Sequence, residues 1–191
     1  MDDGSIKVIK GPMFSDKTTN LIKEMREAKS RYGSHNILGL KHSTDTRYDS
    51  EKIVSHAATT EKAIAIPDLD IARGIINYFG NIKVIFIDEG QFFKDLPQFC
   101  QQMRDLGKHV IVAGLDKNYL REDFEPIKEL SKIANIEEKL YAKCDICKKK
   151  APFTARREKE QTIQDNKIII GGADIYYPTC GKCKYTGDIS R

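Results

Sequence analysis

Four of the five cysteines form two C-x-x-C pairs, Cys144 with Cys147 and Cys180 with Cys183, with 32 residues between the pairs. Each pair can hold one side of a tetrahedral metal ion through thiolates about 2.3 Å away. In a reducing compartment this spacing favours a metal over a disulfide. Four thiolates leave no open coordination position, so we expect a structural zinc ion. Two surface pairs without a metal remain an alternative. Redox use of one pair is disfavoured because no thioredoxin-like βαβ unit surrounds it.

A second group of residues has the pattern of a phosphate-binding loop. Residues 11–18 read Gly-Pro-Met-Phe-Ser-Asp-Lys-Thr, close to G-x-x-x-x-G-K-[ST] between a strand and a helix. In such a loop, successive backbone N–H groups and a helix N-terminus surround the phosphates. Lys17 would reach the β- and γ-phosphates of ATP, and Thr18 would bind Mg²⁺. The alternative is an ordinary strand–turn–helix junction.

The loop departs from the pattern at one position, because Asp16 occupies the place of the second glycine. A carboxylate beside the phosphates has the wrong charge. Two unit charges about 4 Å apart interact by roughly 4 kcal/mol at an effective dielectric of 20. Aspartate tolerates left-handed backbone angles better than most residues. We therefore expect the loop to form, with weakened ATP binding or a distorted shape.

An acidic pair, Asp88-Glu89, follows the apolar run at residues 83–88. A P-loop enzyme places the acid that holds Mg²⁺, directly or through water, at the end of such a strand. A neighbouring glutamate can accept a proton from a substrate hydroxyl. The alternative is a strand that ends in solvated acids. Together with the phosphate loop, the pair favours phosphoryl transfer.

The elements that position these residues alternate between strands and helices, which predicts an α/β fold with a mostly parallel sheet flanked by helices. Near-continuous apolar runs suit strands buried on both faces. The helical period ends near residue 142, which predicts a P-loop NTPase (RecA-like) domain over residues 1–142 and a small zinc-ribbon domain with a lid loop over residues 143–191. The expected strands cover residues 5–10, 36–41, 63–66, 83–88 and 109–115, and the expected helices cover residues 19–31, 68–79, 95–106 and 126–134.

Composition and charge limit the function classes. With 191 residues, 40% of them apolar and 31% charged, the chain can form a packed core and a well-solvated surface. A net charge of +4 is too small to indicate a nucleic-acid binder. No apolar run approaches the roughly 20 residues of a membrane span, and residues 1–5 lack the features of a signal peptide. Cys100 falls at helical spacing among apolar residues, so we expect a buried core thiol.

Several segments together resemble the type II thymidine kinases, the zinc-containing cellular type. The resemblance covers about residues 6 to 185, and the segment Asp-Glu-Gly-Gln-Phe-Phe and the loop between the two cysteine pairs are far more specific than a phosphate loop alone. It implies an enzyme that transfers the γ-phosphoryl group of ATP to the 5′-hydroxyl of thymidine, with deoxyuridine a possible substrate. The segments are Gly-Pro-Met-Phe-Ser-x-Lys-Thr-Thr (11–19), Asp-Thr-Arg-Tyr (45–48), Ile-Asp-Glu-Gly-Gln-Phe-Phe (87–93), Val-Ala-Gly-Leu-Asp (112–116), Phe-Thr-x-Arg (153–156) and Gly-Gly-Ala-Asp-x-Tyr (171–176).

The resemblance also implies roles for single residues. Glu89 would be the base for the 5′-hydroxyl, Lys17 would handle the ATP phosphates, and Arg47 would lie near the transferred phosphate. Thr18 and Asp88 would hold Mg²⁺. The residues implied for ATP binding are Gly11, Pro12, Met13, Phe14, Ser15, Asp16, Lys17, Thr18, Thr19 and Asp88. The residues implied for thymidine binding are Met13, Phe92, Leu115, Tyr119, Thr154, Gly172 and Tyr176.

Three readings of the function follow. The first is an active, cytoplasmic, typically homotetrameric thymidine kinase with dTTP as a possible feedback inhibitor and no nucleic-acid or membrane partner. The second is a catalytically impaired or altered member, favoured by Asp16, by Ala57-Ala58 after His56, and by Lys117-Asn118 after Asp116. The third, a zinc-ribbon nucleic-acid module on an ATPase, is disfavoured because the basic residues are not interleaved with stacking aromatics.

Overall fold

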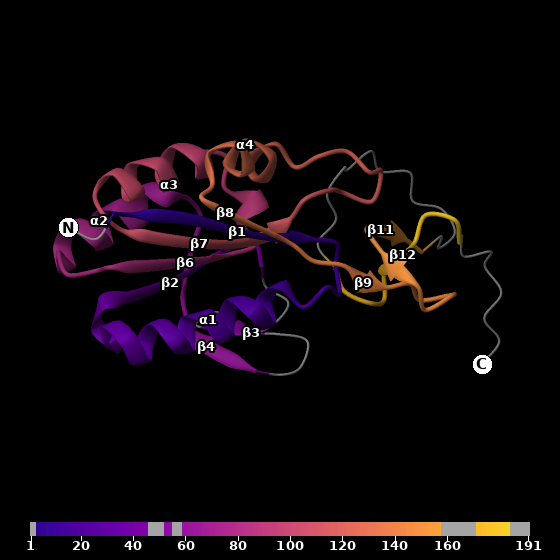
Figure 1. Ribbon diagram of the computed structural model, residues 1–191, viewed down its shortest axis with the longest axis horizontal. Coiled ribbons are helices and arrows are strands. Elements are labelled where there is room, and N and C mark those ends of the chain that lie inside the picture. The colour runs from indigo at the N-terminus through magenta and orange to yellow at the C-terminus, as the bar shows by residue number, and fades with distance from the viewer. Residues whose placement is uncertain (1–2, 46–51, 55–58, 158–170, 184–191) are drawn as a thin grey trace.

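A computed structural model describes residues 3–45, 52–54, 59–157 and 171–183 (Figure 1). Arg47, Ala57-Ala58 and residues 158–170 of the expected lid lie outside these ranges. In the part of the chain that is described, no helix is both long and apolar enough to cross a membrane.

A parallel sheet of six strands forms the centre of the molecule, in the order β5-β2-β6-β7-β1-β8. The two central strands β6 and β7 are nearly continuous buried apolar runs, as expected for strands covered on both faces. The strands are β1 (Ser5–Gly11), β2 (Ile37–His42), β5 (Ile64–Ile66), β6 (Val84–Asp88), β7 (His109–Leu115) and β8 (Ile136–Lys139).

Helices cover the two faces of the sheet unequally (Figure 1). One face packs against α2, α3 and α4, and the other packs against α1 together with the hairpin of β3 and β4. Two short 3₁₀ turns, η1 (Ser34–Asn36) and η2 (Gly90–Phe92), connect elements. The other bounds are α1 (Lys17–Tyr32), α2 (Leu69–Phe79), α3 (Leu96–Asp105), α4 (Glu125–Ile133), β3 (Lys52–Val54) and β4 (Thr60–Lys62).

The alternation of side chains along each strand produces the two cores. In β6, Ile85 and Ile87 point into the core below α2, α3 and α4, whereas Phe86 points into the core below α1. Cys100 of α3 is fully buried in the first of these cores, as its spacing predicted. Both layers are therefore built from residues that are neighbours in sequence.

The expected strands and helices are all confirmed, with small differences at their ends. The edge strand β8 was not predicted, because its sequence Ile-Glu-Glu-Lys is charged. The structure explains the charges: Lys7 of β1 is paired with Glu138 at 2.9 Å, and Lys10 is paired with Glu137 at 2.8 Å. Charged side chains on an edge strand also discourage pairing with other chains.

Four short strands follow the sheet and form two antiparallel pairs, β9 with β10 and β11 with β12. Figure 1 shows them at one end of the sheet. Their buried apolar cluster is small and consists of Ala142, Cys144 and Ala151. The bounds are β9 (Ala142–Lys143), β10 (Lys150–Ala151), β11 (Phe153–Arg156) and β12 (Tyr176–Thr179).

The parallel arrangement brings the carboxyl ends of several strands to one edge of the sheet. Gly11 ends β1, Asp88 ends β6 and Leu115 ends β7. In open α/β sheets, ligands bind outside this edge. The phosphate loop, the acidic pair and the four-cysteine segment all lie near it.

Candidate active site and metal centre

The phosphate loop spans residues 12–16 between β1 and α1. Gly11, the last residue of β1 before the loop, has no room for a side chain, since a Cβ atom there would lie 2.6 Å from the Leu140 carbonyl oxygen. Two side chains close the loop on the carbonyl oxygen of Pro12: the Ser15 hydroxyl donates to it at 2.8 Å and the Lys17 ammonium at 2.6 Å. The loop is thus a compact turn that leads into the first turn of α1.

Asp16 has a left-handed backbone conformation, which glycine adopts at no steric cost. Its φ is 61° and its ψ is 23°, in the left-handed region, and its side chain makes no capping hydrogen bond to α1. Phe14 is also left-handed, with φ of 63°. Aspartate occupies this region more readily than most residues, so the loop keeps its turn. The Asp16 side chain is exposed and borders the same small cavity as Lys17.

The acidic pair meets the loop through Thr18. The Thr18 hydroxyl lies 3.3 Å from each carboxylate oxygen of Asp88, which is fully enclosed at the end of β6. A hydroxyl and a carboxylate that face each other supply the oxygen ligands that Mg²⁺ prefers. The two residues therefore fit a magnesium site.

The electrostatics at Asp88 agree with a cation site. Burial, together with the negative charges of Glu89 and Asp45, raises the pKa of Asp88 to about 7, although the Glu89 backbone N–H and the Lys17 ammonium oppose the rise. A divalent cation beside Asp88 would favour the charged form of the carboxyl group and would lower its pKa.

Glu89 lies on a tight turn directly after Asp88. Its backbone is left-handed, with φ of 53°, and its N–H donates to the Asp88 carboxylate at 3.0 Å. The next residue, Gly90, lies against β7, where a Cβ atom would be 2.5 Å from a methyl carbon of Val112. Glu89 is only partly exposed. The turn therefore presents a carboxylate beside the phosphate loop.

Gln91 links this carboxylate to the neighbouring strand. Its side-chain NH₂ donates to the Glu89 carboxylate at 2.5 Å, and its carbonyl oxygen accepts from the Leu115 backbone N–H at 2.9 Å. Gln91 is buried. The ends of β6 and β7 are thereby joined through one amide side chain.

A small cavity lies between the loop and the acidic pair. Its lining includes most of the residues expected at the ATP site and, from the expected thymidine pocket, Met13 and Leu115. The lining residues are Met13, Phe14, Ser15, Asp16, Lys17, Thr18, Thr19, Asp88, Glu89 and Leu115.

The remaining expected thymidine contacts come from β11, β12, the turn η2 and two loops. The Thr154 hydroxyl accepts a hydrogen bond from the Met13 backbone N–H at 2.9 Å, so β11 reaches the phosphate loop. The Tyr119 and Tyr176 rings lie 6.3 Å apart, and the Gly172 carbonyl accepts from the Tyr176 N–H at 2.9 Å. Phe92 lies against the ring of His42, with 5.6 Å between the ring centres.

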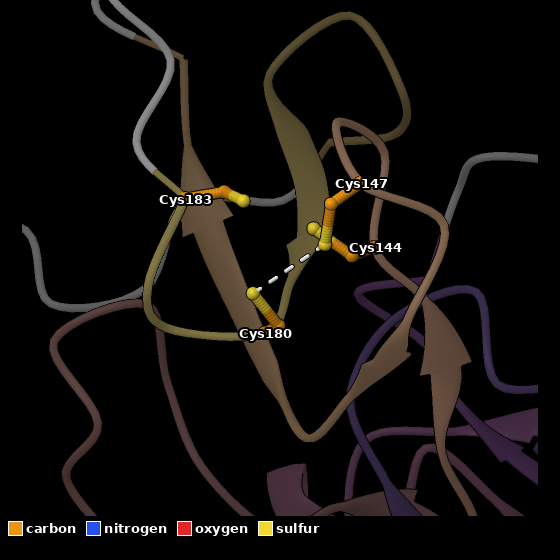
Figure 2. Close-up of side chains that lie close together, drawn as sticks. All are labelled: Cys144, Cys147, Cys180 and Cys183. Carbon is orange, nitrogen blue, oxygen red and sulfur yellow. Dashed lines mark hydrogen bonds between the residues drawn. The ribbon is translucent and has the colours of Figure 1, made fainter.

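The four paired cysteines converge, as Figure 2 shows. All four sulfur atoms lie within 4.8 Å of one another, and the sulfur atoms of Cys147 and Cys180 are 3.7 Å apart. Tetrahedral thiolates at about 2.3 Å from zinc would be about 3.8 Å from each other. Two left-handed residues, Lys148 and Gly181, turn the chain around the cluster. The geometry fits a zinc ion.

The thiols of the cluster have unequal acidities. Burial would raise the pKa of Cys144, but hydrogen bonds from the backbone N–H groups of Cys147, Cys180 and Ile146 outweigh it and lower the pKa to about 6. The pKa of Cys183 rises to about 12 because of its contacts with the Cys147 and Cys180 side chains. Four thiolates this close together need a cation to neutralise them.

Comparison with known proteins decides the family. The family model described as thymidine kinase matches residues 4–184, almost the whole chain. The chain belongs to the thymidine kinase family. Thymidine kinase a of Arabidopsis thaliana is 39% identical over 97% of this chain and 77% of its own length. The cytosolic thymidine kinase of Homo sapiens is 37% identical over 95% of this chain and 74% of its own length. The thymidine kinase of Vaccinia virus (strain Ankara) is 38% identical over 98% of this chain and 99% of its own length.

Two residues of this thymidine kinase family member were not singled out from the sequence as site residues. Gln91 was seen only as part of a motif, although an amide two residues beyond an acid and followed by two phenylalanines is a signal for a buried polar contact. Asp45 was likewise seen only in its motif, and it adds to the charge around Asp88. Its signal was weaker because it lies in a polar loop.

Proposed function

We propose that the chain is an ATP-dependent thymidine kinase that forms dTMP and ADP. The observation that carries the proposal is the convergence of the Asp88–Thr18 pair and the Glu89 carboxylate beside the phosphate loop, in a chain of the thymidine kinase family. In this proposal thymidine lies with its 5′-hydroxyl toward Glu89 and with its base toward Met13, Leu115, Tyr119, Thr154 and Tyr176.

Glu89 acts as the general base. Its carboxylate takes the proton as the 5′-oxygen forms a bond to the γ-phosphorus, and the bond from that phosphorus to the bridging oxygen of ADP breaks. The backbone N–H groups of the loop and the Lys17 ammonium bind the phosphate oxygens. Lys17 leaves the Pro12 carbonyl to reach them. Most of the rate enhancement comes from positioning and from charge stabilisation.

Thr18 and Asp88 would hold Mg²⁺, which would neutralise negative charge on the β- and γ-phosphates. Arg47 is proposed to lie near the transferred phosphate. Phe92 and Gly172 are proposed to contact the nucleoside. Residues 143–191 are proposed to form a zinc domain next to a nucleotide-binding domain at residues 1–142. Zinc would tie β9–β12 together and supply no chemistry to the reaction.

Further properties are proposed from the family. The protein is proposed to work in the cytoplasm as a homotetramer, with dTTP as a feedback inhibitor. The name of the Homo sapiens relative gives that protein as cytosolic. The impaired-member reading depends on the charge of Asp16, which lies at the rim of the cavity rather than between Thr18 and Asp88.

The direct test is transfer from ATP and Mg²⁺ to thymidine, with deoxyuridine, deoxycytidine and no nucleoside run in parallel. We expect dTMP and ADP in equal amounts, and little ADP without nucleoside, since a closed site excludes water. Equal ADP release with and without thymidine would contradict the proposal. So would absence of dTMP from folded, zinc-loaded protein.

A further inference from the structure

The Gln91 side chain is placed as a rigid link between two strands. It is 4% exposed, and both of its polar atoms have partners: the NH₂ group donates to Glu89 and the carbonyl oxygen accepts from Leu115. An amide buried in this way is costly unless its hydrogen bonds are made. The orientation of the Gln91 side chain is therefore set by its two hydrogen bonds within the protein and not by contacts with water.

One of these partners belongs to the central sheet. Leu115 ends β7, which lies between β6 and β1 in the sheet and pairs with both. Its backbone N–H is an anchor that moves only with the sheet. Gln91 connects this N–H group to the Glu89 carboxylate, to which its side-chain NH₂ group donates at 2.5 Å.

The other partner needs such an anchor. Glu89 has a flexible side chain on a left-handed turn residue, and a carboxylate that rotates presents its oxygens in varying directions. Holding Oε2 fixes the direction in which the other oxygen points. The same amide also fixes the Leu115 backbone at the rim of the cavity, so one side chain sets the distance between the base and that wall.

We propose that Gln91 is a positioning residue that orients the Glu89 carboxylate toward the substrate hydroxyl. This inference rests on the proposed function, because it assigns Gln91 a role in the reaction proposed for Glu89. Gln91 acts through Glu89 and does not itself take the proton. Misplacing a reacting group by about 1 Å costs on the order of 100-fold in rate, which sets the size of the expected effect.

Two substitutions separate the bond to Glu89 from the bond to Leu115. Gln91→Met has a similar length and removes both hydrogen bonds. Gln91→Glu keeps an oxygen that can accept from the Leu115 N–H but removes the donor to Glu89. At a pH that ionises the introduced carboxyl group of Gln91→Glu, we expect both variants to lose about 100-fold in kcat, with KM for ATP changed less than about threefold.

A double-substitution cycle tests whether Gln91 acts through Glu89. If it does, Glu89→Gln combined with Gln91→Met will be no slower in single-turnover transfer than Glu89→Gln alone, because residues that act as a unit are not additive. A residue that only supports the fold would slow the reaction by a similar factor in either background.

The matched control is Asn135→Ala. The Asn135 side chain also accepts from a strand N–H, that of Ile6 at 2.8 Å, at the far end of β1. We expect this control to lower thermal stability without lowering kcat. Zinc content and melting temperature are measured for every variant.

The outcomes are distinct. Wild-type kcat in Gln91→Glu, or full additivity in the cycle, would overturn the role of Gln91 while leaving the kinase proposal intact. Absence of thymidine phosphorylation by the wild-type protein would instead defeat the proposed function itself. A large fall in kcat in both variants, absent from the Asn135 control and from the Glu89→Gln background, is the result that we expect.

Discussion

The sheet and the four-cysteine segment are stabilised in different ways. On one face of the sheet alone, twenty buried side chains form a continuous apolar cluster. Around the cysteines the buried cluster contains three residues, Ala142, Cys144 and Ala151. A cluster of that size buries too little apolar surface to offset the entropy of ordering four strands. Burial therefore stabilises the first region, whereas we expect the second to depend on a metal ion.

The two regions also differ in how closely they follow their sequence patterns. The cysteine pattern is complete, and its four sulfur atoms meet within 4.8 Å. The phosphate loop has an aspartate in place of a glycine, yet its backbone is turned as a glycine would turn it. A metal site loses its ion when one ligand is lost, while a loop built from backbone groups tolerates a side chain that points outward.

The largest effect is expected for Glu89, at the edge of the sheet where the carboxyl ends of the strands lie. Glu89→Gln should lower thymidine phosphorylation by about 10³-fold, because general base catalysis typically contributes 10²–10⁴. Thymidine binding by calorimetry, zinc content and melting temperature should stay close to wild type. Turnover within tenfold of wild type would show that another group accepts the proton, and that the chemistry is not confined to this edge.

The next effect concerns the metal. Cys180→Ser should remove the zinc and disorder strands β9–β12, because structural zinc contributes about 10 kcal/mol or more to the folding of small domains. Thymidine phosphorylation should fall with it, since Thr154 and Tyr176 belong to this region. Limited proteolysis should cut after residue 142 and leave a folded sheet, with its helical circular dichroism retained.

The control for the metal is Cys100→Ala. Burial raises the pKa of the Cys100 thiol, as expected for an inert core cysteine. This variant should lower the melting temperature of the sheet and keep one zinc ion per chain. Loss of zinc from the Cys100→Ala variant would contradict the distinction between the two regions. Unfolding of the sheet in the Cys180→Ser variant would contradict it as well.

A smaller effect is expected at Asp16. Asp16→Gly should lower the KM for ATP by several-fold to about tenfold, because it removes a negative charge from the rim of the phosphate cavity. Asp16→Asn separates charge from backbone, since asparagine also tolerates the left-handed region. If Asn behaves as Gly does, the charge is responsible. If only Asp16→Gly lowers the KM for ATP, the backbone conformation is responsible. If neither substitution lowers it, Asp16 does not weaken ATP binding.

The smallest effect is a pH dependence of stability. The pKa of Asp88 is raised to about 7 in the folded chain, so the folded chain binds this proton more tightly than the unfolded chain does. The free energy of unfolding therefore falls as the pH rises from about 4 to 7. In magnesium-free buffer, Asp88→Asn should therefore match wild type near pH 4 and exceed it by roughly 1–3 kcal/mol above pH 7. Urea unfolding at several pH values measures this difference. Mg²⁺ with ATP should reverse its sign, and a pH-independent difference would contradict the assignment.

The sequence predicted those parts of the molecule in which local pattern and final environment agree. The run Val-Ile-Phe-Ile-Asp of β6 is apolar because both of its faces are covered, so its local pattern alone predicts a buried strand. The strand β8 was missed because its glutamates are explained only by Lys7 and Lys10 on the neighbouring strand. The position of Lys10 beside Glu137 is a property of the register, which no local pattern shows.

The site was predictable to a similar degree. Motif and spacing identified the cysteines, the phosphate loop and the acidic pair, because each is a short segment with its own chemistry. The link from Gln91 to Leu115 joins residues 24 positions apart, and it exists only because β6 and β7 are neighbours. The left-handed backbone of Glu89 was not indicated either, since glutamate rarely adopts it.

The place of Phe14 connects these two regions. It belongs to the phosphate loop, yet its ring packs against the cluster of Ala142, Cys144 and Ala151 together with the other three cysteines. A residue of the loop that is proposed to bind ATP therefore packs against the segment that zinc is proposed to hold together. Zinc supply would then govern both substrates of the enzyme at once, and a cell short of zinc would lose donor binding and acceptor binding in the same step.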